Sequence, residues 1–514
     1  MTDRWLSKVI PCQGGLVLNI DALSLGTAFP GAASILQNFE PSVSGGYRRL
    51  SGYNEFDSAA VPGTTNAPVL GVKVAFDGVF ACRLNSTDNA IHFSTGSGWT
   101  KVSTTARTGG VTKARFIAYS ITEPVVIQCD GVNPAWKWNG TVEATINGTG
   151  APANPKYASI FRDRLALSGY GDGSKLALSA PNDDEEFDGS NGAIEFNVGD
   201  TVMGIKLFRE ELIIFCKNSL KKLIGSTSSD FAIVDVTNSV GCLSGDTIQE
   251  LAGDLVFVAT DTVRSYAATE RNSDVNISSV SLNIQPIIVQ LISDGYEAED
   301  FSSCCIRKKS QYRIFVNNTD STTQDNLGIL GKVQDAPTVP KGIYEWSTIV
   351  GIKPYCADSE FTGRIEISVI GDPQDGKVYR LESGNTFGGI NIQAVYRTPD
   401  LTFDDATLRK VIHKGYFVTQ VEGNLDATVQ LLLDREMTGI IQPNPIGLSQ
   451  QGVVPVYGEA EYGTDVYGAF VAPSFKKNFI GSGMFGAFQF VCNDDSAPFR
   501  IDSFQIEYAQ KGRR

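Results

Sequence analysis

The sequence has 514 residues, 42% of them hydrophobic and 19% charged, and it contains 52 glycines. This composition excludes a disordered chain and favours a turn-rich β protein with a sizeable core and more than one domain. The 43 basic and 57 acidic residues give a net charge of −14, which disfavours ordinary binding to the DNA phosphate backbone.

The first extended segment, ASILQNFEPSVSGGYRRLSGY, covers residues 33–53 and predicts an N-terminal extended arm over residues 1–60. Its proline and glycines set turns and oppose a long helix. The adjacent Arg48 and Arg49 suggest contacts with carboxylates or phosphates, because each guanidinium presents a fixed fork of donors. The alternative is a strand pair that caps an edge of the fold, with both arginines in solvent. Six residues are candidate assembly contacts: Asn38, Phe39, Pro41, Arg48, Arg49 and Tyr53.

From about residue 69 the chain falls into short strand-like runs separated by Gly, Asp, Asn and Ser. Two packets, VLGVKVAF to WTKVST and KARFIAYSI to TVEATI, each predict four antiparallel strands, and similar packets recur about every 40 residues. Radially repeated sheets solve the problem of exposed strand edges, so residues 61–390 predict a β-propeller-like domain of about six to eight blades. A series of stacked sandwiches is the alternative.

Two stretches interrupt this rhythm. Residues 280–301 have apolar positions at mixed spacing and predict a short helical insert, and residues 317–326 predict a polar loop. Beyond residue 391 the runs become longer, and alternation in ATVQLLLD and SFQIEYAQ predicts a C-terminal β-sandwich over residues 391–514. No apolar window reaches the length of a signal peptide or a membrane helix, so membrane insertion is not expected.

The sequence shows no catalytic, cofactor or metal motif, and we expect no enzyme. The isolated His92 and His413 argue against a histidine zinc site or a histidine-dependent triad. The nine cysteines have no CxxC pair, and we expect reduced, buried thiols. The acidic run at 183–186 lacks the spacing of an EF-hand and predicts a solvated loop. Trp136, Trp138 and Trp346 fit blade cores better than sugar-stacking platforms.

Several segments in order resemble tail nozzle or tail hub proteins of short-tailed double-stranded DNA bacteriophages. They are QGGLVLNIDAL, FPGAASILQNFEPSVSGGYRRLSGY, FRDRLALSG, LIIFCKNSLKKLIG, GCLSGDTIQELAGDLVFVATDTVRS and FQIEYAQKGRR. The resemblance implies a structural virion protein of the tail, made in the host bacterial cytoplasm. It implies a homo-hexameric ring around the DNA exit channel, which contacts portal-adaptor proteins and tail fibres or spikes and helps genome retention and ejection.

On this hypothesis double-stranded DNA passes through the ring without sequence-specific binding, and the acidic balance suits such a conduit. Arg48 and Arg49 would form ion pairs with a neighbour or the adaptor, so their joint replacement by Ala would impair assembly more than folding. A carbohydrate-active propeller and a host-receptor-binding propeller on the phage tail are the alternatives.

Overall fold

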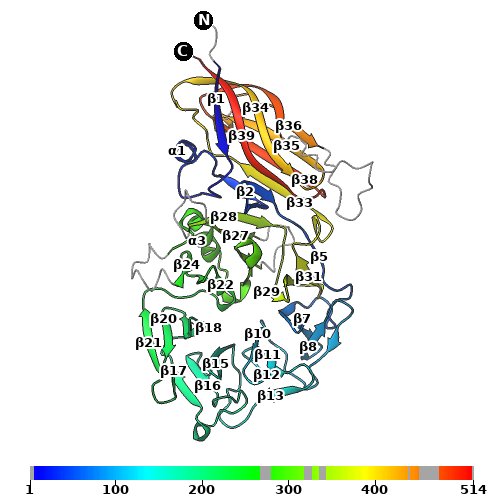
Figure 1. The fold of residues 1–514 in the computed structure, drawn as a ribbon, viewed down its shortest axis with the longest axis vertical. Coiled ribbons are helices and arrows are strands. Elements are labelled where there is room, and N and C mark those ends of the chain that lie inside the picture. Colours follow the sequence, from blue (N-terminus) through cyan, green and yellow to red (C-terminus); the bar gives the residue numbers. More distant parts are fainter. Residues whose placement is uncertain are drawn as a thin grey trace.

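The computed structural model describes residues 5–266, 279–317, 327–334, 343–437, 440–450 and 474–511, and the chain is mainly β as predicted. Figure 1 shows a ring of small sheets below and longer strands above, with both chain ends at the top. The predicted polar loop at 317–326 lies outside the described residues, apart from Asn317.

The ring consists of antiparallel sheets formed by consecutive strands, which confirms the propeller-like interpretation. The first blade is β6 (Val69–Ala75), β7 (Gly78–Asn85), β8 (Asp88–Ser94) and β9 (Thr100–Lys101). The second is β10 (Arg115–Ser120), β11 (Pro124–Cys129), β12 (Ala135–Trp138) and β13 (Glu143–Ile146). The third is β14 (Tyr157–Phe161), β15 (Arg164–Tyr170), β16 (Lys175–Leu178) and β17 (Ile194–Asn197). The fourth is β18 (Val202–Phe208), β19 (Glu211–Cys216), β20 (Leu220–Ile224) and β21 (Ala232–Thr237).

Three further sheets complete the ring. The fifth contains β22 (Gln249–Leu251), β23 (Asp254–Val258) and β24 (Val263–Ser265). The sixth is β25 (Phe301–Ile306), β26 (Gln311–Val316), β27 (Leu327–Gln334) and β28 (Ile343–Val350). The seventh combines β29 (Cys356–Thr362), β30 (Ile365–Gly371) and β31 (Val378–Leu381) with β5 (Tyr53–Glu55) from the N-terminal segment. The described residues therefore form seven blades, within the predicted six to eight.

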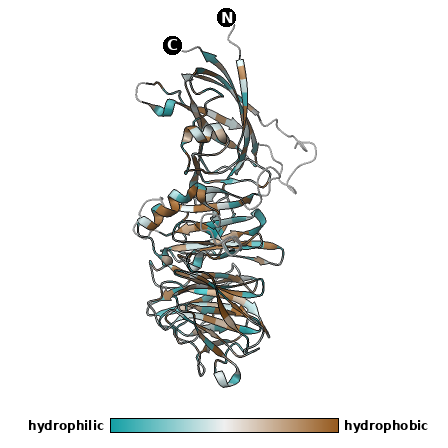
Figure 2. Ribbon diagram, turned by 90° about the vertical axis from the view of Figure 1, so that its left-hand side faces the viewer, coloured by the Kyte–Doolittle hydropathy of each residue, from teal (hydrophilic) through white to brown (hydrophobic). Residues whose placement is uncertain are grey.

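Each blade is apolar on both faces because it packs against two neighbours. In β19, Leu212 and Ile214 pack into the core shared with the third blade, whereas Ile213 and Phe215 pack into the core shared with the fifth. A strand with period 2 thus supplies two cores, which explains the continuous apolar run ELIIFC. Figure 2 shows the hydrophobic residues along the stacked strands of the propeller.

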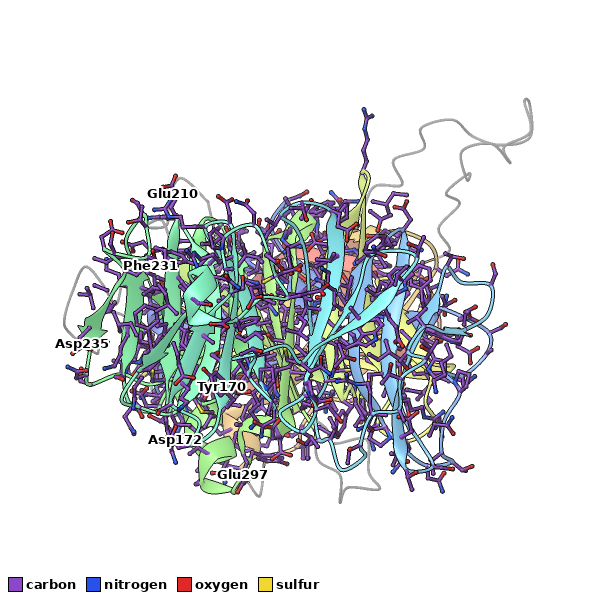
Figure 3. All side chains as sticks on the ribbon, turned by 90° about the horizontal axis from the view of Figure 1, so that it is seen from below. Tyr170, Asp172, Glu210, Phe231, Asp235 and Glu297 are labelled. Atoms are coloured by element: carbon purple, nitrogen blue, oxygen red, sulfur yellow. The ribbon has the colours of Figure 1, made fainter. Side chains whose placement is uncertain are left out.

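The innermost strands close the ring. β6 lies beside β10, β10 beside β14, β14 beside β18, β22 beside β25, β25 beside β29, and β29 beside β6. β18 contacts the short helix η2 (Gly245–Thr247), which leads into β22. Figure 3 views the ring from the side, with Glu210, in the turn after β18, at one face and Glu297, before β25, at the other. We call these the Glu210 face and the Glu297 face.

Helices are few. The expected helical insert is present as η3 (Leu282–Ile284), α3 (Gln285–Ser293) and η4 (Ala298–Asp300). A helix that the sequence did not predict, α1 (Ala22–Ala28), begins after Asp21, whose carboxylate accepts a hydrogen bond from the Leu23 backbone N–H at 3.0 Å. The other short helices among the described residues are η1 (Gly189–Asn191), η5 (Arg307–Lys309) and η6 (Asp434–Glu436).

The C-terminal strands form the predicted sandwich above the ring. One sheet contains β34 (Arg409–Val421), β37 (Ser474–Gly483) and β39 (Phe499–Lys511). The other contains β33 (Ile390–Arg397), β35 (Leu425–Leu433), β36 (Ile446–Gln450) and β38 (Gly486–Asp494). Phe417, Phe488 and Phe504 pack between the sheets in a core that continues into the sixth blade through residues such as Tyr312 and Phe301.

The N-terminal segment is extended, as predicted, but its short strands are inserted into both bodies. β1 (Trp5–Pro11) pairs with β39, and β3 (Phe39–Pro41) and β4 (Tyr47–Arg49) join the same sheet. β2 (Ile35–Gln37) pairs with both β28 and β33, and β5 pairs with β31 and with β32 (Thr386–Phe387), which precedes β33. The first 60 residues thus link the propeller to the sandwich.

Candidate functional site

The centre of the propeller is hollow. A cavity of about 560 Å³ is lined by the innermost strands of the ring, from Leu70 in β6 round to Glu360 in β29. Its volume is in the range of small-molecule sites in proteins. Most of its charged side chains come from these strands or from the residues just before them, so the ring closure brings together groups far apart in sequence.

At the Glu297 face, the charges at the mouth of the cavity compensate one another. Arg115 donates to both oxygens of Asp246 at 2.8 Å and to Glu299 at 2.8 Å, and Lys156 lies 3.0 Å from Glu299. Burial alone would raise the pKa of Glu299, but Arg115 and Lys156 outweigh it and lower the pKa to about 2. Each of these four charged side chains therefore has a partner of opposite charge.

Three lysines lie further along the lining. Lys113 is buried, donates to the backbone carbonyls of Phe301 and Tyr355, and has its pKa lowered by burial. Lys73 lies 3.1 Å from both oxygens of Asp358. Lys206 has an exposed side chain although β18 is an innermost strand, and among the described residues no carboxylate lies within ion-pair distance of it. Enclosure by the ring and the field of Lys73 lower its pKa.

The described residues contain no cluster of side chains suited to a metal ion. Part of the acidic run at 183–186 forms contacts within the chain. Asp184 accepts hydrogen bonds from Lys137 at 2.6 Å and from the Tyr119 hydroxyl at 2.7 Å. His92 is buried, and burial lowers its pKa to about 4, while His413 packs against Trp5 with ring centroids 4.6 Å apart and the rings tilted by 31°. Neither histidine belongs to a group of side chains suited to a metal ion in the part of the chain that the structure describes.

The predicted core roles of the cysteines and two tryptophans are confirmed. All nine cysteines are free and buried, which includes Cys216 and Cys492 in their strands. Trp136 is fully buried and donates to Glu143 at 2.9 Å, and Trp346 is 1% exposed. Neither indole can therefore stack on a sugar, whereas Trp138 is partly buried against Phe80.

The first three candidate assembly residues lie at the joint between the two bodies. Asn38, at a positive φ of 54°, donates to the carbonyls of Val350 in β28 and Gln393 in β33 at 2.9 and 2.8 Å, and thereby clamps propeller to sandwich. Phe39 is fully buried, and Pro41 is buried beside it in β3.

The two arginines are also used within the chain. Arg49 is 0% exposed, forms a buried ion pair with Asp494 and donates to the carbonyl of Asn385 at 3.0 Å. Arg48 is bidentate on Glu422, at 2.6 and 2.7 Å, and lies 3.0 Å from Glu40. Both arginines contact carboxylates, as their fork of donors suggests, but these carboxylates belong to the same chain, and Arg49 is not in solvent.

Tyr53 is partly buried and packs on Phe387 with ring centroids 5.6 Å apart; burial raises its pKa to about 12. The structure thus brings all six candidates to one interdomain joint. It also adds residues that the sequence did not single out: Glu40 lies 2.7 Å from Lys309 and 3.4 Å from Arg313. Arg313 and Lys206 could have been noticed in the sequence, because each is a charged residue within an otherwise apolar strand, QYRIFV and VMGIKLF respectively.

Comparisons with known proteins identify no family for this chain. No family model matches the sequence, and no curated protein matches it. Two similar solved structures are described as extracellular domains, one of a hybrid two-component and one of a one-component system from B. thetaiotaomicron. Each is 10% identical, with TM-scores of 0.39 and 0.38 over 66% and 65% of this chain, and the chain spans only 41% of each of those proteins.

Proposed function

We propose that this protein is a structural component of the tail of a short-tailed double-stranded DNA bacteriophage. In this proposal it forms a homo-hexameric ring around the DNA exit channel, docks on portal-adaptor proteins, carries tail fibres or spikes, and helps to retain and eject the genome. The proposal rests first on the ordered sequence segments that resemble tail nozzle and hub proteins.

The observation that supports it best is the interlocked joint between propeller and sandwich. Five strands from the first 60 residues pair with both bodies, and one apolar core runs from the sixth blade into the sandwich. A subunit that must withstand the force of DNA passage needs such a rigid connection rather than a flexible linker.

The propeller cavity is of small-molecule size, so duplex DNA does not pass through it. The exit channel would therefore run between copies of the chain. Each copy has a net charge of −14, and a wall with this charge repels phosphates and reduces adhesion of the passing duplex.

Electron microscopy of the purified protein, alone and with the portal-adaptor complex, tests the proposal. We expect closed rings of six copies around an open channel, and no binding to duplex DNA even at low salt. A protein that remains monomeric with the adaptor, or that binds DNA tightly, would overturn it.

A groove on the propeller favours a second candidate, non-catalytic binding of a host glycan. This groove, of about 290 Å³, lies between the second, third and fourth blades and is lined by polar residues such as Asn154 and Asp172. Figure 3 shows Asp172 towards the same face of the ring as Glu297. If the purified protein competes with phage adsorption and Asp172→Ala abolishes the competition, receptor binding is the better assignment.

A further inference from the structure

The propeller cavity has more positive than negative charge, although the whole chain is acidic. Four cationic side chains line it: Lys73, Lys113, Arg115 and Lys206. Three carboxylates line it: Asp246, Asp358 and Glu360. Over these lining side chains alone, the excess is therefore one positive charge.

Two of these cations have no carboxylate in ion-pair contact among the described residues. Lys113 donates instead to the backbone carbonyls of Phe301 and Tyr355. Lys206 has no hydrogen-bond acceptor in the part of the chain that the structure describes. Arg115 is bidentate on Asp246, and Lys73 occupies Asp358, which also accepts from the Val74 backbone N–H at 2.8 Å. The fields of Asp358 and Glu250 reach Lys206, but neither carboxylate is in ion-pair contact with it. An ammonium group has only donors, so its missing partner is an acceptor.

A second, independent group in the same lining also lacks a partner. Ser302, in β25, is 3% exposed, and its hydroxyl makes no hydrogen bond to any described residue. The adjacent Ser303 shows the contrast, because its hydroxyl donates to the Asp246 carbonyl at 2.8 Å and accepts from Gln249 at 3.1 Å. Buried hydroxyls without a partner are rare, so the Ser302 hydroxyl has hydrogen-bonding capacity that the described residues leave unused.

We propose that the central cavity of the propeller binds a small oxyanion, a phosphate or carboxylate group, with Lys206 supplying the charge and Ser302 a hydrogen bond. The cavity has room for the group and for a small molecule attached to it. This inference is independent of the proposed tail function, since it concerns one chain and not the ring.

Binding to the purified full-length chain tests the proposal, with inorganic phosphate and acetate as probes and sodium chloride at equal ionic strength as the reference. Isothermal calorimetry measures affinity, and the shift in melting temperature gives an independent readout. We expect phosphate or acetate to bind and to raise the melting temperature above the value in chloride. The stronger of the two probes identifies the class of oxyanion.

Three variants locate the site. Lys206→Gln should weaken binding at least about tenfold, and Ser302→Ala should weaken it several-fold, as expected for a charge-assisted and a neutral hydrogen bond. Lys217→Gln makes the same charge change at an exposed lysine outside the cavity and should bind like the parent. Lys206→Arg keeps the charge and should retain measurable binding.

The melting temperature of each variant in chloride shows that it is folded, and the exposed side chain of Lys206 makes its replacement tolerable. Absence of binding by both probes would refute the proposal. Equal affinities in Lys206→Gln and Lys217→Gln would refute it as well.

Discussion

Arg49 provides the sharpest test of how the N-terminal segment joins the propeller to the sandwich. Its guanidinium is fully buried against Asp494 and also donates to the carbonyls of Asn385 and Asp494, at 3.0 and 3.2 Å. Arg49→Met keeps an unbranched apolar stem but removes the guanidinium, so the Asp494 carboxylate is left without its cation. Removal of one partner of a buried pair costs about 3–5 kcal/mol, because a desolvated charge remains.

Unfolding in guanidinium chloride, followed by tryptophan fluorescence, measures this cost as a lower midpoint. The exposed pair Arg162–Glu210, 3.5 Å apart, is the matched control, and Arg162→Met should cost less than about 1 kcal/mol. In the double variant Arg49→Met with Asp494→Leu no charge is stranded, so we expect much of the lost stability to return. If Arg49→Met is as mild as Arg162→Met, the assignment of Arg49 to a buried joint is refuted.

Three further perturbations test the fold and its charges. Gly71→Ala should destabilise the ring by about 1–3 kcal/mol, because its Cβ would lie 1.9 Å from the Ala114 carbonyl oxygen; Gly447→Ala, with open space around it, is the control in thermal unfolding. His92 has its pKa lowered to about 4, so its neutral form stabilises the fold above pH 6.5 and that stability is lost as the pH falls towards 4; His92→Gln should flatten the pH dependence of melting in this window. Burial would raise the pKa of Glu382, but Arg313 and Lys309 outweigh it and lower the pKa to about 2. The ionised carboxylate therefore stabilises the fold above pH 4.5, and this stabilisation is lost as the pH falls towards 2. Glu382→Gln should weaken the dependence of the melting temperature on pH in this acid range.

Strand positions could be predicted because local patterns determine them. Alternating apolar runs and turn residues located the four strands of the first blade. Phe76 and Asp77 form the turn after β6, both at positive φ. Strand pairing beyond neighbours could not be predicted in this way. Nothing local in Tyr53–Glu55 shows that β5 pairs with β31, more than 300 positions later.

The contacts of the candidate sites could not be predicted for the same reason, because they join parts of the chain that are far apart in sequence. The paired arginines lie in the segment that joins the two bodies, but their carboxylate partners, Glu422 and Asp494, lie in the last quarter of the chain and come close only in the folded state. Lys206 and Ser302 lie in ordinary strand sequences. Their position in one cavity lining follows only from the ring, which brings the innermost strands together.

The position of β5 also bears on how the ring closes and where a neighbour would bind. Residues just ahead of the first blade supply the outer strand of the last one, so the two ends of the propeller are held together by sheet hydrogen bonds as well as by the contact of β29 with β6. This closure uses Asn38, Arg49 and Tyr53 within the chain, whereas Val43, in the turn between β3 and β4, is 72% exposed. If copies assemble into a ring, their contacts come from groups left exposed, such as Trp5 and Val9 on β1, which has a paired strand on only one side among the described residues. The assembly hypothesis thus moves from the arginine pair to the outer edge of the sandwich, where a charged substitution such as Val9→Glu should block ring formation and leave the isolated chain folded.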